Sequence, residues 1–414
     1  MNRLFVIMAV LALYVCKAAS QTREFDMTKQ QPIYSDANGY GYDVVEAPHA
    51  KSLQPYYFSV KVPDGNYKVT VVLGSKKQAG CTVVRAESRR LFVEATPTKK
   101  GELKTCEFIV NKRSPKIDGK RRVSIKEKEK EYLDWDDRLT LEFNGAAPLV
   151  NSIKIEPVSN VQTIFLCGNS TVVDQNNEPY ASWGQMIPRW FDTSVAISNH
   201  AESGLTAKTF LAGKRLDKIL SMMKENDYVF VEFGHNDQKE KYAGDGAWYS
   251  FVHNLKIYID KVKAKGGHVV FVTPTQRRLF NDDKKTIRES HGDFPDAMRY
   301  VAKRENVPVI ELHDMTRDFF ETLGFENSKH ALVHYPMGTF PNQQKALADN
   351  THFNPYGAYE VAKMVIMGIK QHHLPMENGI KSDFQDYDPK HPDDWTHFVW
   401  YPSAKSDITK PDGN

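Results

Sequence analysis

The 414-residue chain has only four cysteines, and their spacing excludes a cysteine-based zinc framework. No Cys-x-x-Cys pair and no His-Glu-x-x-His motif occurs, so the sequence indicates neither a zinc module nor a zinc protease. Cys81, Cys106 and Cys167 lie beyond the N-terminal region. In an oxidising compartment Cys81 and Cys106 can pair, because both fall in one strand-rich region; three unpaired thiols are the equal alternative.

The chain also lacks a large excess of positive or negative charge. The chain has 55 Lys and Arg residues against 52 Asp and Glu residues, a net charge of +3. This balance provides no broad basic field, so we expect no nucleic acid partner. His330 and His334 have helical i, i+4 spacing, but no third ligand follows nearby. We therefore expect no metal ion at this pair.

Long hydrophobic runs are absent after the first residues. The one apolar run, 4–15, follows Arg3 and precedes the small residues Ala18, Ala19 and Ser20. At about 1.5 Å per residue it is too short for a bilayer core of roughly 30 Å. This layout is typical of a secretory signal peptide covering residues 1–20. We expect a secreted protein without a membrane span, either periplasmic or extracellular.

The remaining chain divides near residue 158. Residues 21–158 show short alternating runs separated by turn residues, which predicts an all-β sandwich. The runs at 56–62 and 66–73 flank Pro63-Asp64-Gly65 and read as a hairpin. The other expected strands are 81–87, 91–94, 106–110, 122–125, 139–143 and 152–155.

From residue 159 to residue 374 apolar strands alternate with helices, which predicts a parallel sheet covered on both faces. The expected strands are 163–167, 195–198, 228–233, 268–273 and 309–312, and the helices include 183–190, 247–264, 293–305 and 356–371. Residues 375–414 are rich in Pro, Asp and aromatic residues and show no period. We expect this tail to pack on the body of the protein.

Small and polar residues follow three of the expected parallel strands, at 168–171, 203–206 and 234–237. The carboxyl ends of parallel strands meet at one sheet edge, where ligands bind. Asp349-Asn350-Thr351-His352 comes just before Asn354-Pro355, which has the pattern of a helix N-cap followed by proline. The four blocks are therefore expected to meet at one site.

These blocks contain the parts of a serine esterase. Ser170 is the candidate nucleophile, His352 its general base, and Asp349 the acid that orients the imidazole. The oxyanion donors are the backbone N–H groups of Ser170 and Gly204 and the side chain of Asn236. No Gly-x-Ser-x-Gly elbow occurs, which argues against a standard α/β-hydrolase. The serine esterase chemistry implies neither a metal nor an organic cofactor.

The same blocks resemble those of the SGNH (GDSL-type) hydrolases. More narrowly, the chain is similar to rhamnogalacturonan acetylesterases of carbohydrate esterase family 12, through 181–185, 199–204 and 349–357. The likeness extends to 39–42 and 135–137 in the β-rich part. The resemblance implies a flavodoxin-like three-layer hydrolase domain behind a galactose-binding-like β-domain, and removal of acetyl groups from pectic polysaccharide.

One residue departs from the family pattern, which usually has Asp where this chain has Asn169. Asp349 already holds the position of the triad acid, so we expect the side chain at position 169 to hydrogen-bond to neighbouring loops. Asn still accepts a hydrogen bond there while also donating. We expect Asn169 to tune the catalytic site or to slow its reaction slightly.

Four further residues are weaker candidates for substrate contact. Arg277 and Arg278 suit a galacturonate carboxylate, and a surface arginine pair is the equal alternative. Trp183 either stacks on a sugar or packs in the core. His200, with Glu202, lies near the oxyanion loop and is a candidate supporting residue.

Two other functions remain open at this level. One is an esterase for another acetylated glycan, such as xylan, or for another ester. The other is a catalytically silent carbohydrate-binding protein, which only Asn169 favours. The sequence leaves the oligomeric state undetermined.

Overall fold

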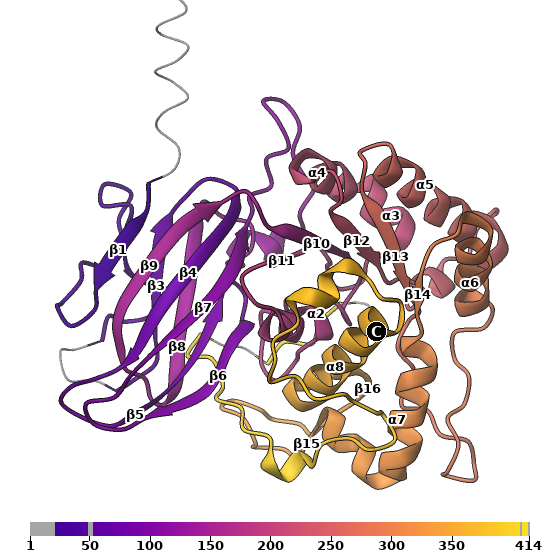
Figure 1. Ribbon diagram of the computed structural model, residues 1–414. Helices are drawn as coiled ribbons and strands as arrows, with labels where there is room; N and C mark the ends of the chain where they lie inside the picture. The colour runs from indigo at the N-terminus through magenta and orange to yellow at the C-terminus, as the bar shows by residue number, and fades with distance from the viewer. Residues whose placement is uncertain (1–20, 49–52, 406–407, 413–414) are drawn as a thin grey trace, which may run out of the picture.

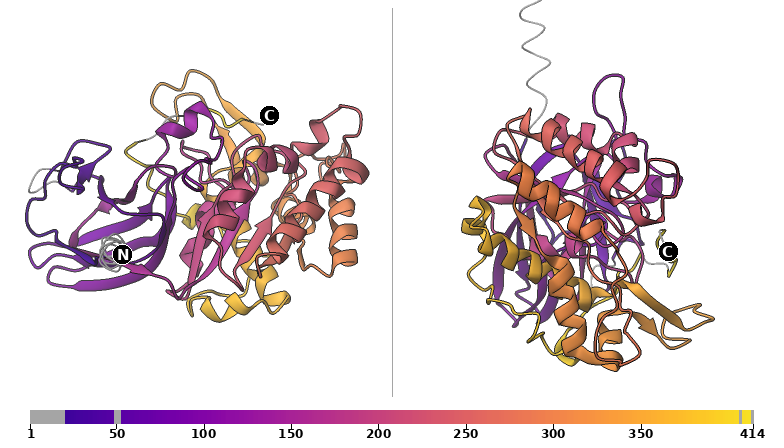
Figure 2. Two further views of the ribbon diagram at one scale, coloured as in Figure 1. Left: turned by 90° about the horizontal axis from the view of Figure 1, so that it is seen from above. Right: turned by 90° about the vertical axis from the view of Figure 1, so that its right-hand side faces the viewer.

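The computed structural model describes residues 21–48, 53–405 and 408–412 (Figure 1). The predicted signal peptide, residues 1–20, lies outside the described residues. Within the described ranges, no helix is both long and apolar enough to cross a bilayer. Seen from above, a β-rich part and an α/β part lie side by side (Figure 2).

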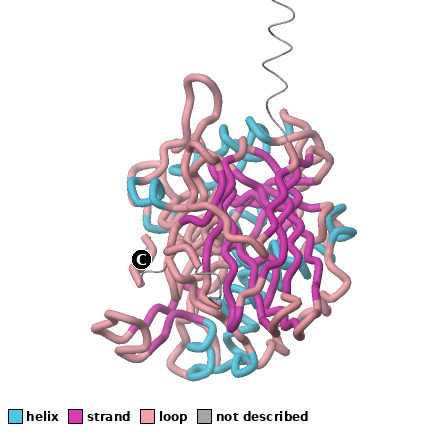
Figure 3. Tube along the Cα trace, turned by 90° about the vertical axis from the view of Figure 1, so that its left-hand side faces the viewer, coloured by secondary structure: helices cyan, strands magenta, loops and turns pink. Residues whose placement is uncertain are grey.

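The β-rich part consists of two packed sheets, in which Figure 3 shows the strands running side by side. Aromatic and β-branched side chains from both sheets, including Phe58, Val69 and Phe108, form one buried core. One sheet has the order β2-β3-β8-β5-β6; the other begins β1-β9-β4-β7. The strands are β1 (Arg23–Asp26), β2 (Tyr40–Asp43), β3 (Tyr56–Lys61), β4 (Gly65–Gly74), β5 (Gly80–Ala86), β6 (Arg90–Thr98), β7 (Leu103–Lys112), β8 (Arg138–Ala147) and β9 (Val150–Val158). The packed sheets agree with the predicted sandwich; its likeness to galactose-binding domains stays a prediction.

Two local predictions for this part are wrong. β3 and β4 do not form a hairpin, because β3 pairs with β2 and β8 whereas β4 pairs with β7 and β9. The turn at Pro63–Gly65 instead carries the chain from one sheet to the other. Residues 122–125 form no strand, and Arg122 makes only an isolated bridge to Lys116. A turn signal shows where the chain reverses, but not which strand it pairs with.

The second sheet continues into the α/β part. β7 pairs in parallel with β11 at Val110 and Ile197, which joins both parts in a nine-stranded sheet. Its parallel half has the order β11-β10-β12-β13-β14. These strands are β10 (Gln162–Cys167), β11 (Val195–Asn199), β12 (Tyr228–Val231), β13 (His268–Val272) and β14 (Val309–Ile310). The change of pattern near residue 158 therefore marks a change of architecture within one continuous sheet.

Helices cover both faces of the parallel half, which gives three layers (Figure 1). Successive residues of β10 alternate between the faces: Leu166 belongs to one core and Phe165 to the other. The helices are α2 (Trp183–Met186), α3 (Ala207–Ala212), α4 (Arg215–Met222), α5 (Val252–Lys263), α6 (Phe294–Glu305), α7 (Leu312–Asn327) and α8 (Pro355–Gln371). The α/β fold with a parallel sheet is confirmed.

The start of α8 follows the predicted capping pattern. The side-chain oxygen of Asn354 accepts the backbone N–H of Gly357 at 3.0 Å, and Pro355 occupies the first turn. Just before it, β15 (Leu332–Tyr335) and β16 (Leu347–Phe353) form a separate two-stranded sheet that the sequence patterns did not reveal. Residues 349–352 thus lie on a strand that leads directly into a capped helix.

The described part of the tail packs on both parts of the molecule. The Arg85 guanidinium of β5 lies 3.8 Å from the centre of the Trp400 ring, and the Trp400 indole donates to Glu178 at 3.1 Å. Cys81 lies on β5 and Cys106 on β7, in different sheets. Both are free thiols, as is Cys167, so the unpaired alternative describes this structure.

Candidate active site

Three of the predicted residues form one chain of hydrogen bonds at the carboxyl edge of the parallel sheet. The Ser170 hydroxyl lies 2.9 Å from Nε2 of His352, and Nδ1 of His352 lies 2.8 Å from Oδ2 of Asp349. Ser170 follows β10, whereas the other two residues lie on β16. All three side chains are at most 5% exposed. This is the geometry that a serine nucleophile, a general base and an orienting acid require.

Asp349 is held as a carboxylate. Burial alone would raise the pKa of its carboxyl group, but the hydrogen bond and electrostatic attraction of His352, together with two backbone N–H groups, outweigh burial and bring the pKa well below the usual range. These are the backbone N–H groups of Thr351 and His352, which donate to Oδ1 at 2.8 and 3.0 Å. The carboxylate therefore stays negative, and it is placed to stabilise a positive imidazole beside it.

The turn that carries Ser170 is stabilised by its own side chains. Asn169 is fully buried, and its Oδ1 accepts from the backbone N–H of Thr171 at 3.1 Å and from the Thr171 hydroxyl at 3.0 Å. The same hydroxyl lies 2.5 Å from Oε1 of Glu232, at the end of β12. Asn169 thus supports its own turn rather than the neighbouring loops that we expected, and its Nδ2 has no hydrogen-bond partner among the described residues.

The two expected oxyanion residues lie beside this turn. The backbone N–H of Glu202 donates to the Gly168 carbonyl at 3.2 Å, which brings the 202–204 turn against the nucleophile turn. Gly204 has φ of +78°, a conformation that favours glycine. The Asn236 amide donates to the Leu205 carbonyl at 3.1 Å and carries a second N–H. The structure thus brings Ser170, Gly204 and Asn236 to one place.

A hollow of about 710 Å³ opens next to the two oxyanion residues. Its lining residues are Gly204, Thr206, Asn236, Lys239, Glu240, Lys241 and Tyr242. Tyr242 is 81% exposed, so an aromatic face borders the hollow. Lys239 also donates to Asn236 Oδ1 at 3.3 Å. A flexible polar ligand has room here, beside two cationic side chains.

Two of the weaker candidates do not contact this space. Trp183 is 1% exposed, and its indole N–H donates to Oε2 of Glu232 at 2.6 Å within the core. The interpretation of Trp183 as a sugar platform is therefore wrong, and the core alternative is correct. His200 is fully buried, with Nε2 2.9 Å from the Ser198 hydroxyl. It cannot reach substrate, because the chain around it excludes solvent.

The two arginines differ from each other. Arg278 is 5% exposed, and its guanidinium binds Ser328 and Asn350, the residue after Asp349. It supports the strand of the triad and is almost fully buried, so the structure does not support the predicted substrate contact of Arg278. Arg277 is only half-buried and donates to the His235 carbonyl at 3.1 Å, next to Asn236. Only Arg277 remains a candidate for substrate contact.

Sequence reasoning missed several neighbours of the triad. The Tyr180 ring lies edge-on to the His352 ring, with centroids 5.8 Å apart. From the tail, Nζ of Lys410 lies 3.4 Å from Oδ2 of Asp349, and Asp412 lies beside Gly204. No local motif predicts these contacts, because the residues that make them are far in the sequence from their partners. His330 and His334 share no helix, since His334 lies on β15.

Comparison with known proteins identifies the family. Residues 166–358 match the model of the GDSL-like lipase/acylhydrolase family. Rhamnogalacturonan acetylesterase RhgT of Bacillus subtilis (strain 168) is 39% identical to the chain over 221 residues, covering 53% of this chain and 94% of RhgT. The chain belongs to the GDSL-like lipase/acylhydrolase family. It is an esterase of the serine-hydrolase type.

Two other relatives come from the same bacterium. The probable rhamnogalacturonan acetylesterase YesY is 32% identical over 224 residues, covering 52% of this esterase and 96% of YesY. The uncharacterized esterase YxiM is 27% identical over 319 residues, covering 76% of this chain and 74% of its own. The match to YxiM is longer than the part of the chain after residue 158, so it extends into the β-rich part.

A buried acid behind the nucleophile turn leads to a prediction about the esterase's stability. Burial raises the pKa of Glu232 to about 7, so between about pH 4.5 and pH 7 the folded state holds a proton that the unfolded chain releases. The free energy of unfolding should therefore fall by roughly 3 kcal/mol as pH rises through this window. Glu232→Gln, which keeps the shape of the protonated acid, should remove that part of the slope.

Urea unfolding at about pH 5 and about pH 8 measures this difference. The matched control is Glu225→Gln, because Glu225 is an exposed carboxylate. The control should keep the wild-type dependence on pH. An unchanged dependence in Glu232→Gln would contradict the assignment of Glu232 as a protonated buried acid.

Proposed function

We propose that this esterase is a secreted carbohydrate acetylesterase that removes acetyl groups from the pectic polysaccharide rhamnogalacturonan. The observation that carries the chemistry is the hydrogen-bonded series from Ser170 through His352 to Asp349, at 2.9 and 2.8 Å. The substrate class is supported by RhgT and YesY, whose names specify rhamnogalacturonan acetylesterase or a probable one. The domain limits predicted above and export by a signal peptide belong to the same proposal.

The proposed reaction has two steps. Ser170 Oγ attacks the acetyl carbonyl carbon while its proton passes to Nε2 of His352, and the sugar oxygen leaves with that proton. Water then attacks the acetyl-serine, with His352 again taking and returning a proton, and acetate is released. Asp349 keeps Nδ1 of His352 protonated and balances the charge of the imidazolium.

Negative charge on the carbonyl oxygen develops in both steps. The backbone N–H groups of Ser170 and Gly204 and the Asn236 amide are the proposed donors to it. The amide is already oriented, because one of its N–H groups is bound to the Leu205 carbonyl. A donor that is fixed before reaction stabilises the transition state without a reorganisation cost.

The charges near the site favour an anionic polymer. Lys239 and Lys241 line the hollow beside the oxyanion residues, and Arg277 lies next to Asn236 through the His235 carbonyl. The carboxylates of a galacturonate-containing chain would complement these cations. Neutral acetylated xylan lacks such carboxylates, so we expect it to be the poorer substrate.

Acetate release tests the proposal directly. Wild-type protein should release acetate from acetylated rhamnogalacturonan faster than from acetylated xylan at equal acetyl content, and should also cleave a small aryl acetate. Faster release from xylan would contradict the substrate class but not the chemistry. No release from any of the three substrates by folded protein would support a silent carbohydrate-binding protein instead.

A further inference from the structure

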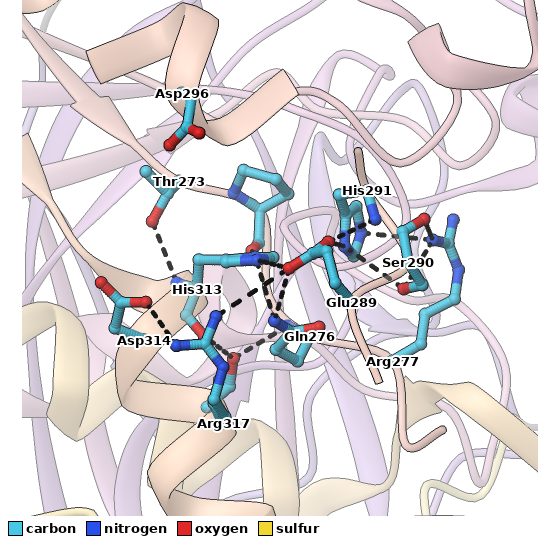
Figure 4. Close-up of polar contacts among 12 residues, drawn as sticks. Thr273, Gln276, Arg277, Glu289, Ser290, His291, Asp296, His313, Asp314 and Arg317 are labelled. Carbon is cyan, nitrogen blue, oxygen red and sulfur yellow. Dashed lines mark hydrogen bonds and ion pairs between the residues drawn. The ribbon is translucent and has the colours of Figure 1, made fainter. Parts of the chain in front are cut away.

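The long segment between β13 and α6 lies against α7, and three side chains of the types that bind metal ions meet there (Figure 4). Glu289 and His291 lie on this segment, and His313 lies in the first turn of α7. One ligand atom from each residue lies within 4.8 Å of the others. Both histidines are at most 2% exposed, whereas the Glu289 side chain is 46% exposed. The cluster is therefore buried on one side and open to solvent on the other.

The hydrogen bonds of His313 place a lone pair in the cluster. Nδ1 lies 2.9 Å from the Pro274 carbonyl, which only accepts, so Nδ1 carries a hydrogen. In a neutral ring Nε2 then has a lone pair, yet it lies 2.7 Å from the carboxylate Oε2 of Glu289. Two such acceptors repel each other unless a proton or a cation lies between them.

The side-chain amide of Gln276 also lies against Glu289 and His313 in this cluster. The Gln276 side chain is 1% exposed, and its nitrogen lies 2.8 Å from Nε2 of His313 and 3.3 Å from Oε2 of Glu289. Its oxygen, Oε1, has no hydrogen-bond partner among the described residues. The two ends of an amide are nearly interchangeable in shape, so a half-turn brings this oxygen into the cluster. The group then supplies an acceptor as well.

The histidines also have partners on their far sides, as metal ligands usually do. His313 binds the Pro274 carbonyl, and Nε2 of His291 lies 3.1 Å from Nδ1 of His235. The same Nε2 also lies 3.3 Å from a guanidinium nitrogen of Arg277, whereas Nδ1 of His291 faces the cluster, 3.8 Å from Oε1 of Glu289.

We propose that Glu289, His291 and His313, with the side chain of Gln276, form a binding site for a divalent transition metal. Two imidazoles and a carboxylate form a nitrogen and oxygen ligand set that is known for zinc. The Arg317 guanidinium, 3.9 Å from Glu289, is held away by its 2.9 Å bond to Asp314.

Such an ion would act on the fold around the catalytic site. It would join the β13–α6 segment, which carries Arg277, to α7. It would also fix His291 against His235, the residue before Asn236. No member of the triad is a ligand, so the ion takes no part in the chemistry of the ester. Zinc binding can therefore be tested whether or not the proposed hydrolysis is correct.

Zinc titration tests the site. Full-length protein, stripped with a chelator and dialysed, is titrated with Zn²⁺ against a chromophoric zinc indicator. The wild type should bind one equivalent and unfold at a higher temperature with zinc. Glu289→Gln should weaken binding by more than about 100-fold, since loss of even an outer-shell partner costs about 10- to 100-fold. It should also lose the thermal shift.

A second ligand variant and a control make the result specific. His313→Gln should also lose zinc binding. Circular dichroism of Glu289→Gln and His313→Gln, compared with the wild type, establishes that both variants are folded. The matched control is Asp388→Asn, which removes an exposed carboxylate 2.9 Å from His391 and should bind zinc as the wild type does.

Cobalt provides an independent readout, because Co²⁺ in a nitrogen and oxygen site of low coordination number absorbs visible light strongly. This absorption should appear in the wild type and not in Glu289→Gln. Wild-type protein that binds no zinc, or equal binding by all variants, would overturn the proposal. Acetate release by the stripped protein decides the esterase separately.

Discussion

Ser170→Ala should abolish ester hydrolysis, with a fall in kcat on the order of 10⁴- to 10⁶-fold. The variant removes the only hydroxyl that is bonded to His352, at 2.9 Å, among the described residues. Residual activity would come from the oxyanion donors and from binding alone. The measurement is acetate release from acetylated rhamnogalacturonan and from an aryl acetate, with the wild type alongside.

The control for this variant is the neighbouring hydroxyl of Thr171, which faces Glu232 and Asn169 rather than the histidine. Thr171→Ser keeps that hydroxyl and should retain most activity. Ser170→Ala should keep the wild-type melting temperature within a few degrees, because only one oxygen is lost. Turnover by folded Ser170→Ala at the wild-type rate would exclude Ser170 as the nucleophile.

Asp349→Asn should lower kcat by about 10⁴-fold, the loss seen when a triad aspartate becomes an amide. The carboxylate accepts from Nδ1 of His352 at 2.8 Å and carries the charge that stabilises the imidazolium. An amide has no charge, and its N–H₂ end favours the wrong tautomer of the ring. Steady-state kinetics on an aryl acetate measure the effect, which should fall on kcat rather than on KM.

Lys410→Met is the matched comparison for Asp349→Asn. Lys410 lies 3.4 Å from the same carboxylate, but from the side of the tail, and its side chain is half-exposed. Removing this cation should change kcat by less than about tenfold, because exposed ion pairs contribute little. A loss as large as that of Asp349→Asn would show that the tail lysine, and not the pairing with His352, sets the activity.

Short motifs made most of the catalytic site predictable. Ser170 follows an apolar strand, and Asp349 and His352 are three residues apart, so local sequence already indicates their roles. A parallel sheet gathers its strand ends at one edge, and this brings distant blocks such as 168–171 and 234–237 together. The cap at Asn354 is equally local, since one side chain binds the N–H group three residues ahead.

Other features were beyond sequence reasoning because they depend on which distant segments pack together. A tryptophan side chain can either pack in a core or stack on a sugar ring. Only its burial in the folded structure shows that Trp183 is internal. Arg277 and Arg278 are adjacent, yet one is half-exposed while the other is bound by Asn350 and Ser328. Neighbours in sequence can thus have opposite surroundings.

By itself, the sequence determined the α/β class and the family resemblance, and it indicated the residues of the proposed hydrolytic site, because strand periods and short motifs depend on nearby residues. Only the tertiary structure decided how β3 and β4 divide between sheets, how β7 joins the parallel strands, and how Glu289 meets His313. These features arise from pairing and packing between segments far apart in the chain. Many alternative pairings satisfy the same local pattern, and burial of the whole core selects among them.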